Sequence, residues 1–273
     1  MRSYRDEAEE LLAARIGDAL DKSRRGEVSV LSYLTPREQK RAERILRAHG
    51  EWPSAYFFGG YPDAERACLF LLPEYLTAIV EAMPEASHEE MAALLGETLT
   101  ETVCALRIRG SGYRILSHRD YLGSILALGI ERDALGDIAV QNDYEAVLFC
   151  SQRMGEFLCE NLTHVASDRV KCVPYRLDDS FVDGRRYRAI SDTVASPRLD
   201  CVVAALTNLS REAAQNAVRA GTVEVDFEPV EQTDLLLTPP VTLSVRGYGR
   251  FILRSFDGET RKGRLRMRAD QLV

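Results

Sequence analysis

The sequence predicts an α+β protein built from three consecutive parts. The first 50 residues show helical periodicity among charged side chains. Residues 102–176 follow the order strand, helix, strand, strand, helix, strand. Residues 196–255 then show two short helices, a strand and a hairpin. A chain of 273 residues suits two domains or three small ones, in agreement with this division.

Composition limits the classes of function. Charged residues make up 28% of the chain and hydrophobic residues 45%, which excludes a disordered chain, a collagen-like repeat and a disulfide-scaffold miniprotein. The net charge of −7 argues against a uniformly basic nucleic-acid coat, so a polyanion site must be a local patch. No apolar stretch has the length of a membrane span and no signal peptide is visible. We therefore expect a cytoplasmic protein without a membrane span.

The cysteines and histidines do not indicate a cofactor. Six cysteines are spread along the chain with no CxxC and no paired Cys/His spacing of the zinc type. In the cytoplasm they are expected to act as small buried hydrophobic residues. We expect neither a metal nor another cofactor.

The N-terminal part is expected to begin with helices and continue with two strands. Thr35 and Pro36 predict a helix start, with Thr35 as N-cap, and this helix should end near Ala48. Residues 54–61 and 67–72 are typical of short strands around a glycine turn.

The middle part has the order of a split β-α-β-β-α-β fold, which is RRM-like (ferredoxin-like). Ser117 is a suitable N-cap for its first helix. In this fold the first and fourth strands are neighbours, so alternating basic residues would share the sheet face opposite the helices. These residues are Arg107, Arg109, Arg169 and Lys171. They form a candidate RNA surface, although charged residues also alternate out of a strand simply because they are solvated.

The C-terminal part carries four motifs in a fixed order. They are Arg198-Leu199-Asp200, Ser210-Arg211-x-Ala213-Ala214, Gly221-x-Val223-x-Val225 and the run from Ser244 to Phe251. Ser196 and Pro197 predict the start of the first helix, and Ser210 that of the second. At 3.6 residues per turn, Arg211, Gln215 and Arg219 fall within about 80° on the solvated face of the second helix.

These motifs together resemble the S-four-type RNA-binding domain, the αL module named after a ribosomal protein. The resemblance implies that Arg198 and Arg211 contact RNA, and guanidinium groups suit phosphates because they donate bidentate hydrogen bonds. Two positions depart from the family: Asp226-Phe227 replaces the usual Asn-Gly, and Pro239-Pro240 replaces the usual Gly-Asp.

A second resemblance covers essentially the whole chain. The segments 57–66 (FFGGYPDAER), 118–123 (HRDYLG), Gly129-Ile130 and 136–138 (GDI) are similar to those of the bacterial YlmH family. That resemblance implies a helical N-terminal domain, an RRM-like domain and an S-four-type module. It also implies binding to the large ribosomal subunit in the rescue or quality control of stalled subunits carrying peptidyl-tRNA.

The end of the chain is basic. Residues 261–268 hold five lysines and arginines. Arg264, Arg266 and Arg268 alternate with apolar residues, so a strand would project all three to one side. We expect them to contact phosphate.

We therefore expect a helical or α+β domain over residues 1–78, an RRM-like domain over 79–178, an S-four-type domain over 186–256 and a basic extension over 257–273. Residues 178–188 are the expected linker. His118 and Arg119 open a helix and either cap it or touch RNA. The candidate RNA-binding residues are Arg198, Ser210, Arg211, Gln215, Arg219, Arg246, Arg250, Arg264, Arg266, Arg268, Arg107, Arg109, Lys171, His118 and Arg119.

The favoured function is docking on structured rRNA of the large subunit, with tRNA and cell-division or translation factors as further partners, and no enzymatic activity. One alternative is an RNA-modifying enzyme of the pseudouridine synthase type, although no catalytic motif of that kind is visible. A second alternative is a cell-division adaptor protein. RNA docking should weaken steeply with salt, whereas a hydrophobic adaptor contact should not.

Overall fold

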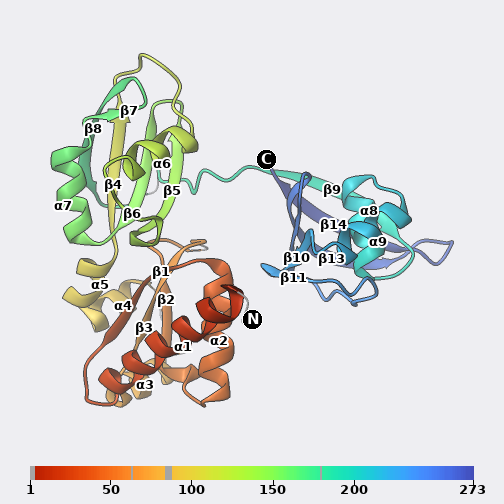
Figure 1. The fold of residues 1–273 in the computed structure, drawn as a ribbon, viewed down its shortest axis with the longest axis horizontal. Helices are drawn as coiled ribbons and strands as arrows, with labels where there is room; N and C mark the ends of the chain where they lie inside the picture. Colours follow the sequence, from red (N-terminus) through yellow and green to blue (C-terminus); the bar gives the residue numbers. More distant parts are fainter. Residues whose placement is uncertain (1–3, 63, 84–87, 179) are drawn as a thin grey trace. The chain divides into compact units, whose positions relative to one another are not determined.

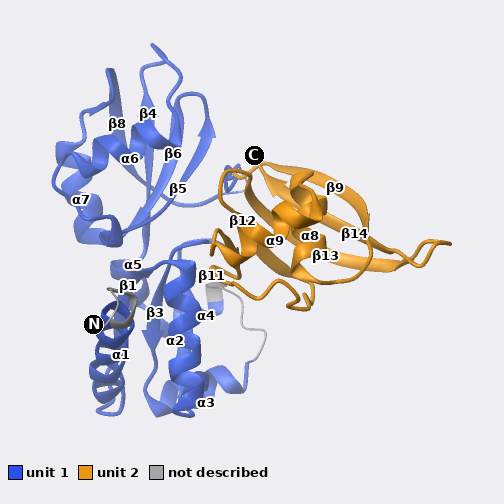
Figure 2. Cartoon of the chain, turned by 45° about the vertical axis from the view of Figure 1, so that its right-hand side comes forward, with its two compact units in different colours: residues 1–184 blue, residues 185–273 orange. Residues whose placement is uncertain are grey.

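The computed structural model folds into two compact units, Met1–Gly184 and Arg185–Val273 (Figures 1 and 2). It describes residues 4–62, 64–83, 88–178 and 180–273. Asp63, inside the glycine-rich motif, and Asp179, inside the expected linker, lie outside the described residues.

The first half of unit 1 is a three-stranded antiparallel sheet of order β1-β3-β2 with helices packed on it. Side chains of α1 and α2 form a core with Leu69 and Leu71 on one face of β3. Cys68 and Phe70, which alternate with them, belong to a second core. The elements are α1 (Tyr4–Ser23), β1 (Ser29–Leu34), α2 (Pro36–Ala48), β2 (Ala55–Phe58), β3 (Ala67–Leu71), α3 (Glu74–Glu81), α4 (His88–Leu95) and α5 (Glu97–Thr102).

Strand β1 corrects the expectation that the first 50 residues are helical. Residues 29–34 pair antiparallel with β3, because their sequence SVLSYL is rich in residues that suit a sheet. The helix start after β1 is confirmed. Thr35 accepts a hydrogen bond from the Glu38 amide at 3.3 Å, and the Glu38 carboxylate accepts one from the Thr35 amide at 2.8 Å.

The second half of unit 1 is a five-stranded antiparallel sheet of order β5-β6-β4-β8-β7. The expected neighbours, the first and last long strands, do pair, with Arg109 opposite Lys171. Helices α6 and α7 pack on one face of this sheet. The elements are β4 (Cys104–Gly110), α6 (His118–Leu126), β5 (Leu135–Asn142), β6 (Glu145–Cys150), α7 (Gln152–Asn161), β7 (His164–Val165) and β8 (Asp168–Tyr175).

The other face of this second sheet packs against the first half of unit 1. Ala105, Val147 and Phe149 share a core with Tyr33 and Phe70. The second helix of the middle part, α7, ends at Asn161, and residues 164–165 turn back as β7 to pair with β8.

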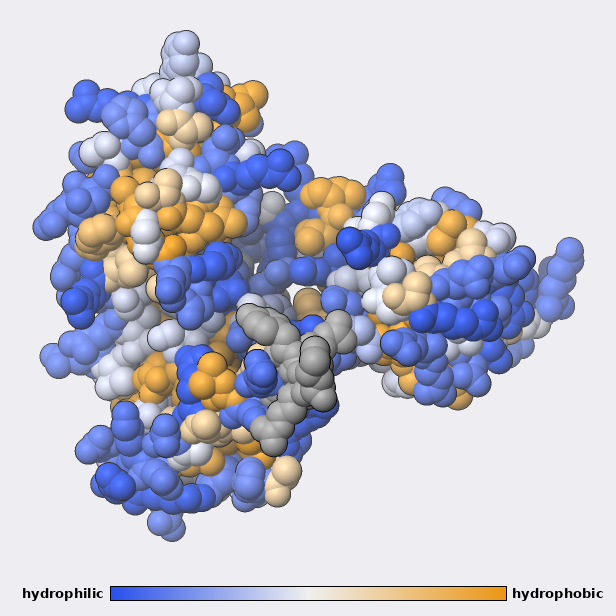
Figure 3. All heavy atoms as spheres, viewed as in Figure 1, coloured by the Kyte–Doolittle hydropathy of each residue, from blue (hydrophilic) through white to orange (hydrophobic). Residues whose placement is uncertain are grey.

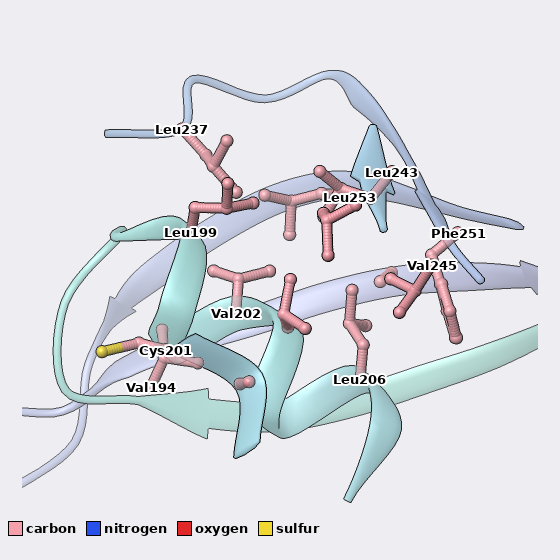
Figure 4. Packing of buried hydrophobic residues seen from close by; sticks show 14 of the residues in the cluster. Val194, Leu199, Cys201, Val202, Leu206, Leu237, Leu243, Val245, Phe251 and Leu253 are labelled. Atoms are coloured by element: carbon pink, nitrogen blue, oxygen red, sulfur yellow. The ribbon is translucent and has the colours of Figure 1, made fainter. Parts of the chain in front are cut away.

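Unit 2 is a six-stranded sheet of order β11-β10-β12-β13-β14-β9 covered on one face by two helices. Figure 4 shows leucines and valines of α8 packed against residues of the strands. The elements are β9 (Tyr187–Val194), α8 (Leu199–Thr207), α9 (Arg211–Arg219), β10 (Val223–Val225), β11 (Glu228–Pro229), β12 (Val241–Val245), β13 (Gly249–Glu259) and β14 (Leu265–Leu272).

Two differences from expectation lie at the start of unit 2. Residues 187–194 form strand β9, so the last two residues of the expected linker belong to a strand. Ser196 and Pro197 do not open the next helix, which begins at Leu199 with Arg198 as N-cap. Before that point the backbone pairs with another loop: the Leu237 amide donates to the Pro197 carbonyl at 2.9 Å, and the Leu199 amide donates to the Leu235 carbonyl at 2.8 Å.

Strand β10, which follows Gly221, ends at Val225. Asp226 and Phe227 have φ of +46° and +68° and form a tight turn into β11. The backbone therefore adopts here the left-handed conformation that Asn-Gly favours, although this sequence has Asp-Phe.

Candidate nucleic-acid interface

A buried carboxylate organises the two helices of unit 2. Asp200, in the first turn of α8, is fully buried. Its Oδ1 is 3.2 Å from Arg198 Nε, and its Oδ2 is 3.2 Å from Arg211 Nε. Gln215 Nε2 donates a third hydrogen bond to Asp200 Oδ2 at 2.7 Å. One acid thus holds two arginines that are distant in sequence close to each other.

The electrostatics of Asp200 favour its charged form. Burial alone would raise the pKa of this carboxyl, but hydrogen bonds from Gln215, Arg198 and Arg211 outweigh burial and lower the pKa to about 2. The Arg198 and Arg211 side chains keep exposed fractions of 35% and 57%. Two oriented guanidinium groups therefore remain available to an anionic partner at neutral pH.

The other candidates on these helices have different surroundings. Ser210 caps α9, and its hydroxyl accepts a hydrogen bond from the Ala213 amide at 3.2 Å. Gln215 donates to Asp200, as described above. Arg219, in the last turn of α9, is exposed. Of the candidates on α9, Arg211 and Arg219 are the ones with exposed cationic side chains.

A second group of arginines lies on the opposite face of the unit 2 sheet. Met267 and Ala269 of β14 point into the core below the helices, so Arg266 and Arg268 project to the other side. Arg250 of β13 shares that face, since its neighbour Phe251 is in the core, and its guanidinium lies 5.3 Å from the Phe227 ring centroid.

Three of the basic residues near this face have local partners. Arg268 forms an ion pair with Asp257, and Arg264 donates to the Thr193 hydroxyl at 2.9 Å. Arg254 pairs with Asp270 at 2.8 Å. Arg246, by contrast, lies in the exposed turn between β12 and β13. The residues expected to form a basic extension are thus part of the sheet, as the end of β13, strand β14 and the turn between them.

The middle sheet places its basic residues together, as expected. Register puts Arg109 opposite Lys171 and Arg107 opposite Val173, so Arg107, Arg109, Arg169 and Lys171 share one face. Sequence reasoning missed Glu145 on the neighbouring strand. Its carboxylate is 3.1 Å from Arg107 Nε and 2.8 Å from Arg109 Nε.

Arg107 is additionally held by an aromatic ring. Its guanidinium lies 3.9 Å from the centroid of Tyr175, and most of the side chain is covered. Arg109, Arg169 and Lys171 are the exposed members of the group.

Replacing Glu145 with glutamine is expected to strengthen RNA binding. The substitution removes the charge that neutralises Arg107 and Arg109 and keeps the shape of the side chain. We expect RNA affinity to rise about two- to five-fold at low salt and the salt dependence to become steeper. Filter binding of the full chain across a salt series measures both effects, with Glu224→Gln in unit 2 as the control. A Glu145→Gln protein that binds like the wild type would show that this face does not meet RNA.

His118 and Arg119 begin helix α6. Ser117 caps this helix and Asp120 completes a capping box, so His118 itself is not the cap. Desolvation of the ring and the nearby Arg132 guanidinium lower the pKa of His118, which leaves it neutral at pH 7. Arg119 is exposed.

A further cluster joins two motifs quoted for the YlmH resemblance. Asp137, of the GDI segment, accepts hydrogen bonds from the Tyr61 hydroxyl at 2.8 Å, the Glu65 amide at 2.7 Å and the Arg66 amide at 3.1 Å. The Arg66 side chain donates to the carbonyls of Leu135 and Tyr33 at 2.8 and 2.9 Å. The two motifs therefore connect the two sheets of unit 1. Sequence reasoning found the motifs but not this structural role.

The described residues show neither a metal-binding cluster nor a membrane-spanning helix. They hold no group of three or more His, Cys, Asp or Glu side chains that could bind a metal. Among the same residues, none of the helices combines the length and the apolar character needed to cross a membrane.

Comparison with known proteins identifies relatives. The family model described as the putative RNA-binding domain in YlmH matches residues 107–179. The ribosome-associated protein quality control protein P2 of Bacillus subtilis (strain 168) is 31% identical over 240 residues, which are 88% of this chain and 86% of that protein. The solved structure of cell division protein ylmH from Streptococcus pneumoniae is 16% identical, with a TM-score of 0.48, over 64% of this chain and 94% of that one. The match to the Bacillus subtilis protein over most of both sequences shows that the chain belongs to the YlmH family.

Proposed function

We propose that this protein binds RNA and docks on structured rRNA of the large ribosomal subunit, in the rescue or quality control of stalled subunits that carry peptidyl-tRNA. The name of the Bacillus subtilis relative and the description of the matching family model support this role. In this proposal residues 186–256 act as an S-four-type module, and residues 79–178 act as an RRM-like domain.

The observation that carries the proposal is the arrangement around Asp200. The acid is buried in the first turn of α8, and it holds the guanidinium groups of Arg198 and Arg211 at 3.2 Å while both side chains stay partly exposed. Phosphate oxygens accept two hydrogen bonds from a guanidinium group, and an arginine that is already oriented loses less conformational entropy on binding. The helix pair is therefore a pre-organised phosphate-binding surface.

The middle domain adds a second, weaker contact in this mechanism. Arg109 and Lys171 are exposed on a unit that the chain joins covalently to unit 2. Two tethered weak sites bind a large RNA more tightly than either does alone, because the second contact becomes intramolecular.

The double substitution Arg198→Ala and Arg211→Ala tests the proposal. We expect RNA affinity to fall about ten- to a hundred-fold and the salt slope to decrease by about 2, since each lost phosphate contact removes about one unit. Sedimentation through a sucrose gradient at low and moderate salt should show wild-type protein with large subunits and the variant near the top.

Arg15→Ala with Arg25→Ala is the matched control, because it removes the same charge from exposed positions of unit 1. Equal sedimentation of the double variant and the wild type would contradict the assignment of the site. A wild-type protein that stays at the top of the gradient would contradict the ribosomal role itself.

A further inference from the structure

The loop between β4 and α6 lies at one end of the middle sheet (Figure 1), and large apolar side chains are exposed on it. Tyr113 has an exposed fraction of 81%, the highest of any large hydrophobic residue in the described part of the chain. Ile115, two residues later, is 64% exposed. Figure 3 shows apolar atoms among hydrophilic ones at this end of unit 1. Large apolar side chains that are exposed close to each other are a recurrent feature of binding sites.

Hydrogen bonds hold the base of this loop. The Ser111 amide and hydroxyl both donate to Asp168, whose side chain is buried at the start of β8. The Gly110 amide donates to the Tyr144 carbonyl at 2.7 Å, and the Leu116 amide donates to the Asp143 carbonyl at 2.8 Å. The loop is thereby fixed to β8 and to the turn between β5 and β6.

Close packing supports the same geometry. A Cβ atom at Gly110 would lie 2.6 Å from Asp168 Oδ2, so only glycine allows the carboxylate to approach the loop this closely. A side chain presented by a pre-organised loop loses little entropy on binding. Tyr113 should therefore lose little conformational entropy when it contacts a partner.

The side chains around the loop are mainly basic. Arg114 lies next to Tyr113 in sequence and stays partly exposed while it contacts Asp120 at 3.4 Å. Arg109 and Lys171 face each other on the strands that lead to the loop, and Arg169 follows on the same side. Asp168 is buried, Asp120 pairs with Arg114 and Glu145 pairs with Arg109, so the exposed Arg169 and Lys171 carry the excess positive charge. This charge favours an anionic partner over an apolar protein pocket.

We propose that Tyr113 stacks on an unpaired base of RNA, while Arg114 and Arg109 contact the adjoining phosphates. The inference rests on the proposed function and adds a single-stranded element to its RNA target. Aromatic rings and arginines that alternate along a surface are the usual platform for single-stranded nucleic acid, because every base offers a π face. The loop also lies within residues 107–179, the region matched by the RNA-binding family model.

Binding of the full chain to a fluorescent RNA decamer of uridines tests the proposal. We expect Tyr113→Ala to weaken this binding about five- to a hundred-fold, the loss of one base stack, with an unchanged salt slope. Tyr113→Phe should bind like the wild type, because the ring is kept. Tyr75→Ala, which removes another exposed tyrosine from α3 of the same unit, should have no effect. Circular dichroism checks that each variant is folded.

Parallel binding to purified large ribosomal subunits separates the outcomes. Equal binding of wild type and Tyr113→Ala to both the decamer and the subunits would overturn the inference and leave the proposed function intact. A loss for Tyr113→Ala on subunits alone, or a wild type that binds subunits but not the decamer, would overturn the assignment to single-stranded RNA. A wild type that binds neither would contradict the proposed function.

Discussion

Replacing Asp200 with alanine is expected to destabilise unit 2 and to weaken RNA binding together. The buried carboxylate accepts hydrogen bonds from Arg198, Arg211 and Gln215, and its loss leaves these donors without their common partner. The two arginines are partly exposed and can be solvated, so we expect a loss of about 2–4 kcal/mol in the free energy of unfolding, not the full cost of a buried unpaired charge. Hydrogen exchange of the full chain over residues 199–219 measures this loss locally.

The effect should depend on pH in a defined direction. The pKa of Asp200 is about 2 in the folded protein, below the unfolded value of about 3.9. Its charge therefore stabilises unit 2 fully above about pH 4, and this contribution disappears as the pH falls through about 2. The difference in the free energy of unfolding between wild type and Asp200→Ala should therefore shrink as the pH falls from about 4 to about 2. Glu231→Ala, at an exposed acid of the same unit, is the control. A constant difference down to pH 2 would contradict the role of the charge.

The second large effect is expected from Gly60→Ala in unit 1. A Cβ atom at Gly60 would lie 2.1 Å from Cδ1 of the buried Phe149 ring, and the φ of +110° disfavours any side chain. The ring cannot move away easily, since Phe149 lies in the core shared by the two sheets of unit 1. We expect the free energy of unfolding to fall by about 3 kcal/mol or more, as measured by urea denaturation of the full chain.

Gly123→Ala is the matched control for this substitution. Gly123 lies inside helix α6 of the same unit, and a Cβ atom there would meet no atom within 4 Å. Because alanine is the better helix former, the free energy of unfolding of this variant should rise by up to about 1 kcal/mol. Similar stability of the Gly60 and Gly123 variants would show that the close contact between Gly60 and Phe149 is absent in solution.

The sequence predicted much of the fold where local signals and packing agree. Thr35, Ser117 and Ser210 all cap helices as expected, and the order of elements in the middle part leads to the expected pairing of its first and last long strands. Strand β9 could not be found, because most of its side chains are exposed and show no regular alternation. Its partner β14, which defines it as a strand, lies about 80 residues later in the chain.

The candidate site was predictable in residue type but not in arrangement. The resemblance to the S-four-type domain implied Arg198 and Arg211, and the alternation of a strand indicated Arg107. Long-range pairing determined what surrounds them, such as the approach of Glu145 to two arginines from a neighbouring strand. The loop residue Tyr113 was missed, because a single exposed tyrosine has no signal in a sequence until the structure shows what fixes its loop.

The pairing of β9 with β14 has a consequence for the way unit 2 folds. These strands are the first and last elements of the unit, and they are in register from Tyr187 opposite Leu272 to Val194 opposite Leu265. The chain between them, which includes α8 and α9, must be closed into one long loop before the sheet is complete, and contacts so distant in sequence slow folding. We therefore expect unit 2 to fold slowly and in a single cooperative step. A partly folded chain would then not display the arginines around Asp200, and RNA would meet either the complete surface or none of it.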